Sequence, residues 1–289
     1  MIRKYFKIGV FAMVALGMVS CMKDLDTNDE KKIEENEAAL NKYILDSALT
    51  DKVTRETTGL IHYKTVTNPA GTAAKTGDEA SVRATAYLLN GKKVTLFPKD
   101  TIVAFPIDGF LTGFGGVELG IKTLKTGEKG TFLLRFYLAY GSGSTSEIPA
   151  YSPIKLEMEF LKIRTEIQQI NEYMEAKQYT PSERTSDNLV LIRTNTVTGD
   201  TLGSGKSVNV KYVLRYLDGT KVDEGTIPHT TNTSGTIAGF DRAVRKMRKN
   251  EKAITIFPSA LGYGKGQMNS QGAFTIRPYA PLQFELEIL

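Results

Sequence analysis

The sequence contains two copies of one segment, and this duplication limits the folds that the chain can adopt. Five short motifs recur in the same order, at offsets of 123 to 130 residues. The pairs are NKY with NEY at 41–43 and 171–173, LLNGKKV with YLDGTKV at 88–94 and 216–222, EK with EK at 128–129 and 251–252, LAYG with LGYG at 138–141 and 261–264, and SPIKLEMEFL with APLQFELEIL at 152–161 and 280–289. Because chance rarely places five matches in one order, the sequence predicts two domains of one fold.

Each copy combines helical spacing with short alternating segments. Apolar residues recur at helical spacing over 34–46 and 166–177, which predicts a lead-in helix before each copy, and again over 240–249. Residues 208–214 and 282–288 alternate apolar with polar side chains, and Asp218-Gly219 is typical of a hairpin turn. We therefore predict an α+β fold in which each copy is an antiparallel β-sheet wrapped on a short α-helix, preceded by a lead-in helix.

The positions of these motifs divide the chain into five parts. We expect a signal peptide at 1–20, a lipidated tether with a lead-in helix at 21–57, a first domain at 58–163, a linker helix at 164–184 and a second domain at 185–289.

The N-terminal residues have the pattern of a bacterial export signal. Three basic residues precede twelve apolar residues at 8–19, a run too short to cross a bilayer. Residues 18–21, Met-Val-Ser-Cys, resemble the lipobox of bacterial lipoproteins. Cys21 is the only cysteine, which excludes an internal disulfide framework. The sequence therefore predicts membrane attachment through a lipid on Cys21. The alternative is a plain signal peptide followed by an incidental cysteine.

The residues after Cys21 bear on where the anchor would lie. By resemblance to other Gram-negative lipoproteins, Met22 favours the outer membrane over the inner one, with the protein facing the periplasm or the cell surface. The acidic tract 22–30 is typical of a solvated spacer. It also resembles surface-export signals of lipoproteins in the Bacteroidota.

Charge and composition exclude several classes of function. Without the signal, 34 basic residues face 32 acidic ones, so the formal net charge falls from +5 to +2, and we expect no nucleic-acid partner. His62 and His229 lie far apart in the sequence, and they are the only histidines, so no metal site is expected. No phosphate-binding glycine loop or paired-carboxylate motif indicates a cofactor, and no feature indicates an oligomeric state.

The second copy carries its motifs in a distinctive order. A strand with a tyrosine leads to an Asp-Gly hairpin, a Gly-Phe helix start, a Tyr-Gly turn and the closing strand Phe-Glu-Leu-Glu-Ile. This combination resembles the FK506-binding-protein (FKBP) family of peptidyl-prolyl cis-trans isomerases, over 58–163 and 185–289. The resemblance implies a shallow apolar pocket for a proline ring. It implies Tyr212, Asp223, Phe240 and Tyr263 as catalytic residues, and Val222, Ile237, Ile276 and Phe284 as substrate-binding residues.

The second copy departs from the family pattern at one wall of this pocket. Val222 stands where the family usually has Phe, and the polar stretch 225–235 contains no F-x-F-x-L-G segment. The sequence does not account for the residue that would close this side.

The first copy departs further. Ala84 falls where the tyrosine is expected and Thr95 where the aspartate is expected, whereas Tyr140 is kept. Either Phe114 or Val117 would serve as the pocket floor. We expect the first copy to keep the fold without a complete site.

Two functions of different classes remain. The first is an isomerase that acts on proline-containing peptides or unfolded exported proteins at the cell envelope, with its activity in the second copy. This reaction breaks no σ-bond, so an apolar cup, exclusion of water and a few fixed donors suffice. The alternative is a non-catalytic peptide-binding or scaffolding lipoprotein built on the same two folds.

Overall fold

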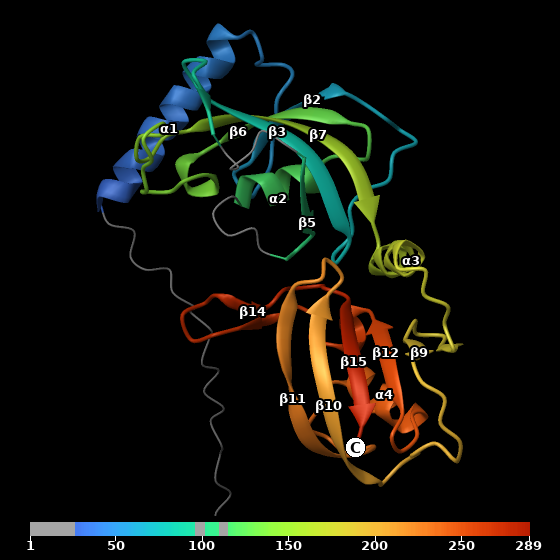
Figure 1. Ribbon diagram of the computed structural model, residues 1–289. Coiled ribbons are helices and arrows are strands. Elements are labelled where there is room, and N and C mark those ends of the chain that lie inside the picture. Colours follow the sequence, from blue (N-terminus) through green and yellow to red (C-terminus); the bar gives the residue numbers. More distant parts are fainter. Residues whose placement is uncertain (1–26, 96–101, 110–114) are drawn as a thin grey trace, which may run out of the picture.

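The computed structural model describes residues 27–95, 102–109 and 115–289 and shows two curved sheets, each wrapped around a helix (Figure 1). The first half contains α1 (Thr27–Asp46), β1 (Thr54–Arg55), β2 (Ile61–Val66), β3 (Glu79–Leu88), β4 (Lys93–Val94), β5 (Val103–Pro106), α2 (Gly115–Lys122), β6 (Lys129–Leu134), the 3-10 turn η1 (Phe136–Leu138) and β7 (Ile154–Arg164). The second half contains α3 (Glu166–Ala176), β8 (Glu183–Arg184), β9 (Val190–Arg193), β10 (Ser207–Tyr216), β11 (Lys221–Thr230), α4 (Ala238–Lys246), β12 (Lys252–Phe257), the 3-10 turn η2 (Ser259–Leu261), β13 (Gln267–Met268), β14 (Phe274–Ile276) and β15 (Leu282–Ile288). The predicted α+β class is confirmed.

The two large sheets have the same strand order. The first runs β1-β2-β6-β7-β3-β4 and the second runs β8-β9-β12-β15-β10-β11, with antiparallel pairing throughout. Each of these six strands of the first sheet therefore has a counterpart in the second. The copies differ at the edge beside β3 and β10, where β4 and β5 pair separately with β3 but β11 is one strand of ten residues. The second half also has the small β13–β14 hairpin.

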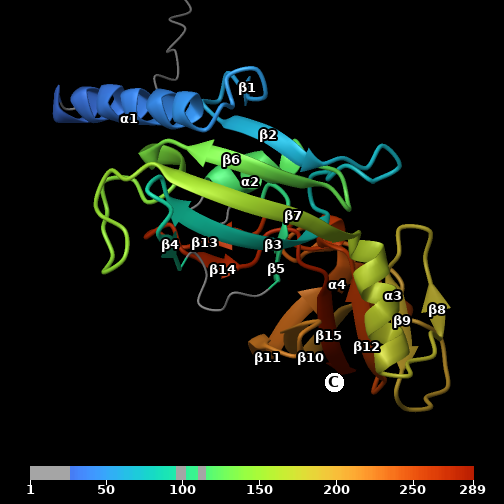
Figure 2. The ribbon, with the colours of Figure 1, turned by 90° about the horizontal axis from the view of Figure 1, so that it is seen from above.

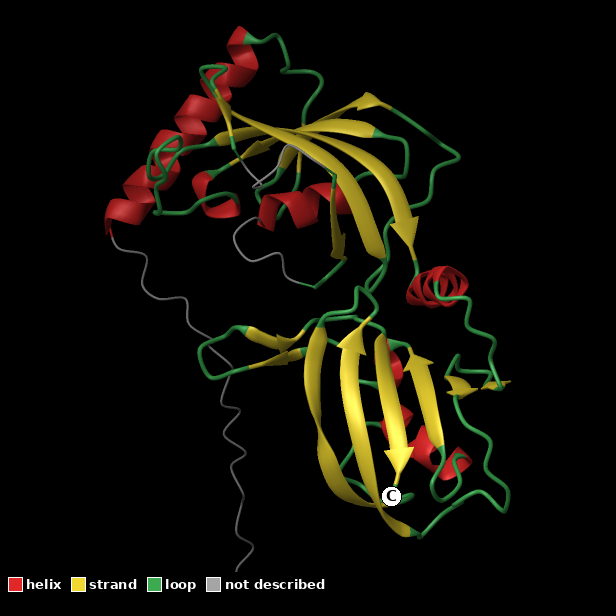
Figure 3. Ribbon diagram, viewed as in Figure 1, coloured by secondary structure: helices red, strands yellow, loops and turns green. Residues whose placement is uncertain are grey.

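Alternation along the strands produces a buried and a wet face, as the sequence predicts. On β15, Leu282, Phe284, Leu286 and Ile288 are buried, while Glu285 is exposed. The buried face of each sheet curves around a short helix, α2 in the first half and α4 in the second (Figure 3). The core of the second domain therefore lies between α4 and the concave face of its sheet.

The lead-in helices cover the opposite face of the sheets. In α1, Leu40 and Ile44 pack against β2 and β6, and in α3, Ile170 and Met174 pack against β9 and β12 (Figure 2). Helix α3 begins at a capping box in which Thr165 and Gln168 exchange side-chain and backbone hydrogen bonds. Each lead-in helix thus packs on the domain that follows it.

A side chain of each lead-in helix also binds the 3-10 turn of its own domain. The amide N–H of Phe136 donates to Asn36 Oδ1 at 3.0 Å. In the second half, Ser259 donates from its N–H and its hydroxyl to the carboxylate of Glu166, at 2.5 and 2.7 Å. Burial raises the pKa of Glu166, against the lowering effect of these two hydrogen bonds. The duplication therefore includes the helices and their polar contacts.

The repeated Glu-Lys dipeptide has a structural explanation. Glu128 and Glu251 are buried, and each follows a residue with positive φ, Gly127 or Asn250. Each carboxylate accepts a hydrogen bond from the backbone N–H three residues earlier, at 2.8 Å in the first copy and 2.6 Å in the second. Each is also ion-paired with a neighbouring strand, through Lys64 or Arg193. These glutamates hold the turn that leads into β6 and β12.

The predicted signal peptide and Cys21 lie outside the described residues. Within 27–95, 102–109 and 115–289, no helix combines the length and the apolar character needed to span a membrane.

Candidate active site

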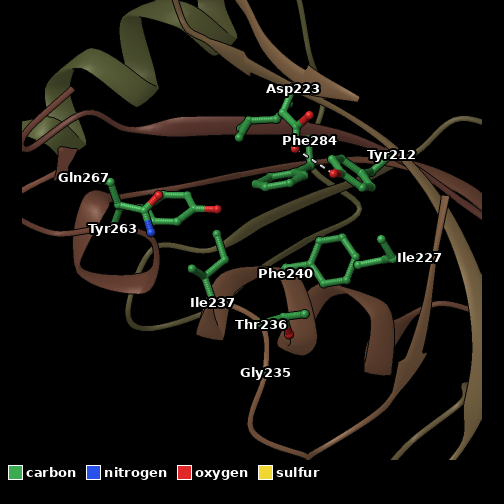
Figure 4. A pocket seen from close by; sticks show the side chains of 11 residues that line it. Tyr212, Asp223, Ile227, Gly235, Thr236, Ile237, Phe240, Tyr263, Gln267 and Phe284 are labelled. Carbon is green, nitrogen blue, oxygen red and sulfur yellow. Dashed lines mark hydrogen bonds between the residues drawn. The ribbon is translucent and has the colours of Figure 1, made fainter. Parts of the chain in front are cut away.

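A cavity of about 420 Å³ opens on the concave side of the second domain (Figure 4). Strands β10, β11 and β15 form its back, the start of α4 forms its floor, and the segment from η2 to β13 forms its remaining side. Six of the eight residues predicted from the sequence line it: Tyr212, Asp223, Ile237, Phe240, Tyr263 and Phe284. These residues are up to 72 positions apart in the chain, and the sheet brings them together.

Three aromatic rings form the apolar part of the cavity. The ring of Phe240 meets those of Tyr212 and Phe284 edge to face, with centroid separations of 6.1 and 5.6 Å. Behind them, Phe257 stacks on Phe284 at 5.8 Å. Such edge-to-face pairs contribute beyond the burial of their area, so the rings hold one another in place.

Gly239 allows Phe240 to reach this position. A Cβ atom at residue 239 would lie 2.6 Å from the ring of Phe257, so a larger residue would push α4 away from β12. The first turn of α4 therefore packs directly against the sheet. This close approach presents Phe240 as the cavity floor.

Tyr212 and Asp223 form the polar rim. Asp223 pairs with Leu214, which is two residues from Tyr212 on β10, so both side chains lie on the same face of the β10–β11 hairpin. The Tyr212 hydroxyl donates to Asp223 Oδ2 at 2.7 Å, and Asp223 Oδ1 accepts from the N–H of Glu224 at 2.8 Å. The hydrogen bond to Asp223, together with burial and the carboxylate charge, raises the pKa of Tyr212 to about 12. Tyr212 is therefore a neutral hydroxyl at physiological pH.

Tyr263 enters from the opposite side, and its hydroxyl is directed toward the middle of the cavity (Figure 4). Burial, and after it the charge of Asp223, raises the pKa of Tyr263. A neutral tyrosine hydroxyl can donate one hydrogen bond. The arrangement thus offers a donor on the far side of the cup from Tyr212.

The wall that the sequence left unassigned is formed by Ile227. The stretch 225–235 is polar in composition, but its first half belongs to β11, where alternate residues face the cavity. The period of two that starts at Asp223 reaches Ile227 and then His229, and this spacing is the signal that could have found Ile227. Four other lining residues were also not predicted: Leu214, Gly235, Thr236 and Gln267.

Val222 and Ile276, predicted to bind substrate, do not line the cavity. The pairing of β10 with β11 shifts register between Leu214 and Arg215, and Val222 falls at this irregularity. Val222 packs against the rim of the core, and Ile276 is buried on β14 within it. The structure places both as support for the cavity and not as part of its surface.

The first domain has a different set of residues at the matching positions. A Cβ atom at Gly116 would lie 2.6 Å from Leu134, as one at Gly239 would from Phe257, so Val117 is the counterpart of Phe240. Phe114, the other candidate, lies outside the described residues. Tyr140 is kept, and its hydroxyl donates to the carbonyl oxygen of Thr95 at 3.2 Å.

Among the described residues of the first domain, Ala84 and Thr95 stand at the positions of the tyrosine–aspartate pair. The small, buried Ala84 lies on β3 where β10 has Tyr212, and Leu156 lies on β7 where β15 has Phe284. Aliphatic side chains replace all three rings of the aromatic cup.

The comparisons with known proteins agree with this geometry. Residues 199–289 match the family model of the FKBP-type peptidyl-prolyl cis-trans isomerases. The second domain is thus similar to the catalytic domain of this family over residues 199–289. The matched range contains the aromatic cup, Tyr212, Asp223 and Tyr263. The resemblance read from the sequence is confirmed for this range at the level of the family.

Individual relatives cover part of the chain. The peptidyl-prolyl cis-trans isomerase FkpA of Escherichia coli strain K12 is 29% identical over 136 residues, which are 47% of this chain and 49% of FkpA. The chain thus spans about half the length of this curated relative. The crystal structure of Escherichia coli FkpA matches with 28% identity and a TM-score of 0.39, over 47% of this chain and 62% of that one. The three FKBP domains of wheat FKBP73 match with 21% identity and a TM-score of 0.40, over 82% of this chain and 98% of that one.

Aromatic rings and hydroxyl groups line the cavity of the second domain. Across the described parts of the chain, no group of three or more His, Cys, Asp or Glu side chains is placed to hold a metal ion. The cup can accept an apolar ring of modest size, and its two tyrosines and one carboxylate stand at the rim.

Proposed function

We propose that the chain is an FKBP-type peptidyl-prolyl cis-trans isomerase whose second domain acts on proline-containing segments of unfolded exported proteins. The observation that carries this proposal is the Tyr212–Asp223 hydrogen bond at the rim of a cup floored by Phe240 and Phe284. The family match of residues 199–289 supports it.

The geometry suits the barrier of the reaction. Rotation about an X–Pro bond costs about 20 kcal/mol because amide resonance is lost as the bond twists. An apolar cup that holds the proline ring lets the preceding carbonyl rotate out of contact with water. Fixed donors at the rim then stabilise the twisted peptide more than the planar one, which lowers the barrier. No proton transfer or covalent intermediate is required.

The roles of the side chains follow from their places. Phe240, Phe284, Ile237 and Ile227 hold the ring. Tyr263 donates to the substrate across the cup. Asp223 holds the Tyr212 ring in the cavity wall through the 2.7 Å bond, and its carboxylate faces the region where the carbonyl turns.

The direct test uses the full chain without its signal. Cis/trans relaxation of a proline tetrapeptide should be faster than in buffer, and Asp223→Ala should slow it. Tyr140→Phe in the first domain is the matched control. A relaxation rate equal to that of buffer, from protein shown to be folded by circular dichroism, would refute the proposal.

We also propose a lipid anchor on Cys21 that holds the protein at the outer membrane, in the periplasm or at the cell surface. Support comes from the basic start, the apolar run at 8–19 and the position of the only cysteine. Labelled palmitate should enter the wild-type protein in bacteria and be absent from Cys21→Ala. Equal labelling of both proteins would exclude the anchor and leave the isomerase proposal unaffected.

The first domain supports a second candidate function. Its Ala84, Val117 and Leu156 place buried aliphatic side chains where the second domain has the three rings, and Thr95 stands in place of the aspartate. This composition favours binding of a peptide without turnover. If proline peptides bind the full chain but no isomerase activity is found, the protein is a binding or scaffolding module. If peptides do not bind at all, this alternative fails as well.

A further inference from the structure

His229 lies directly behind the cavity floor. It is on β11, is only 6% exposed, and does not line the cavity itself. Its ring meets that of Phe240 edge to face, with centroids 5.5 Å apart and planes at 85°. The floor is therefore held between the cavity on one side and an imidazole on the other.

The same imidazole is tied to the helix that carries Phe240. His229 Nε2 is 3.0 Å from Oδ1 of Asp241, the residue that follows Phe240 in the first turn of α4. Asp241 Oδ1 also accepts from the N–H of Asn232 at 2.7 Å, which fixes the loop between β11 and α4. Asp241 is 8% exposed, so this is a buried polar network. It joins β11, the loop and the floor of the cavity.

Three charged groups surround His229. Asp241 and Arg245 come from α4, and their Oδ2 and Nε atoms are 3.0 Å apart. Lys249, after the end of α4, lines with His229 a second cavity of about 500 Å³. From β10, the residue paired with His229 is the apolar Val208. The positive charge of Arg245 already balances the negative charge of Asp241, so protonation of His229 gives the network a net positive charge.

We propose that His229 is a positioning residue for the floor, and that its protonation weakens binding of the proline ring in the cup. This inference rests on the isomerase or peptide-binding function proposed above. A neutral His229 packs against Phe240 and donates to Asp241, and the network behind the floor then carries no net charge because Arg245 balances Asp241. A charged His229 holds water close to the network and to Asp241. Binding of the proline ring must remove water from the cup, and this removal then costs more free energy.

The pH range of the effect follows from the side chain. Histidine side chains in general change charge between about pH 5 and 8. Because the effect acts on the binding of the ring, acidification should raise KM and leave kcat nearly constant. A residue that served only to stabilise the fold would not give this split.

The experiment measures kcat and KM of the full chain with a proline tetrapeptide from pH 5 to 8, and the dissociation constant of the same peptide in parallel. In the wild type, KM should rise on acidification by about three- to tenfold, the size expected for one modest polar interaction. The midpoint should coincide with the titration of the His229 ring followed by NMR.

Two variants separate this role from others. In His229→Gln the amide can still donate to Asp241 but does not titrate, so KM should no longer change with pH. His62→Gln is the matched control, because His62 is the only other histidine, is buried, and is also 3.0 Å from a carboxylate, that of Glu56. His62→Gln should keep the pH dependence of the wild type.

His229→Ala removes the edge contact with Phe240 and should raise KM at every pH. Thermal unfolding followed by circular dichroism will show whether each variant is folded. A KM independent of pH in the wild type, or a pH dependence that persists in His229→Gln, would overturn the inference. Absence of isomerase activity would refute catalysis alone, and the pH dependence of peptide binding would still decide the role of His229.

Discussion

The Tyr212 hydroxyl lies 2.7 Å from Asp223 Oδ2, across the β10–β11 hairpin and at the rim of the aromatic cup. This bond is the point at which the two copies of the fold differ most, since Ala84 and Thr95 occupy the matching positions of the first domain. It joins two strands that the hairpin already pairs, so it orients the tyrosine ring more than it stabilises the sheet. Its consequences can be measured.

Asp223→Asn should lower the pKa of Tyr212 from about 12 toward the ordinary value of 10.0. The carboxylate both accepts the hydroxyl proton and repels the tyrosinate charge, and the amide does so far less. Ultraviolet titration of tyrosinate should show one tyrosine moving to lower pH. The Tyr212→Phe variant identifies that tyrosine, because its curve lacks the latest transition. An unchanged titration in Asp223→Asn would contradict the hydrogen bond.

Gly239→Ala should destabilise the second domain by about 1–3 kcal/mol, because the added Cβ would overlap the ring of Phe257. Displacement of α4 should also raise KM, since Phe240 moves with it. Gly115→Ala in α2 is the control, because a Cβ there meets no atom within 4 Å. Urea unfolding followed by circular dichroism measures the stability of both variants. Equal stability of Gly239→Ala and the wild type would show that the helix does not need this close approach.

Glu251→Ala should lower the free energy of unfolding by about 3 kcal/mol. The Glu251 side chain is 1% exposed, and its loss removes the carboxylate that pairs with Arg193 and accepts from the N–H of Arg248. The ion pair of Glu224 with Lys221 lies on the surface, so Glu224→Ala should change stability little. The free energies of unfolding of Glu251→Ala and Glu224→Ala, measured in urea, test this difference. Similar small effects from both would mean that the buried glutamate does not hold the turn.

The hairpin turn of the second domain should weaken in acid. Burial disfavours the charged form of Asp218, but hydrogen bonds from Arg277 and Thr220 outweigh this effect and lower its pKa from 3.8 to about 2. A lowered pKa in the folded state gives stability that is present above pH 3.8 and is lost as pH falls toward 2. The difference in melting temperature between the wild type and Asp218→Asn should therefore be constant above pH 5 and shrink below pH 4. A difference that does not change with pH would contradict this role.

The sequence predicts the fold well because the repeat and the strand alternation act together. Each matched motif belongs to the same strand, turn or helix in both halves, and the period of two on β10 and β15 sets which residues face inward. The resemblance to the FKBP family, and not this periodicity, predicted that Tyr212, Phe240 and Phe284 share one site, and all three line the cavity.

The parts of the site that the sequence missed depend on register and tertiary approach. Ile227 lies in a segment of polar composition, so the period of two from Asp223 is easily overlooked, and the pairing of β11 with β10 turns Ile227 toward the cup. Val222 was predicted to face substrate, but the register shift beside Arg215 removes it from the cavity. The close packing of Gly116 on Leu134 makes Val117 the positional counterpart of Phe240, and no local sequence pattern reveals this packing.

The central claim is that isomerase activity resides in the second copy of the fold. The measurement that tests it most directly compares kcat/KM for a proline tetrapeptide between two double variants of the full chain, Asp223→Ala/Phe240→Ala and Thr95→Ala/Tyr140→Phe. The first pair removes the aspartate and the floor of the cup, and the second alters the matching region of the first domain. We expect a loss of about tenfold or more in the first, the size of a lost transition-state contact, and a rate within about twofold of the wild type in the second. Equal losses in both, or full activity in the first, would contradict the account.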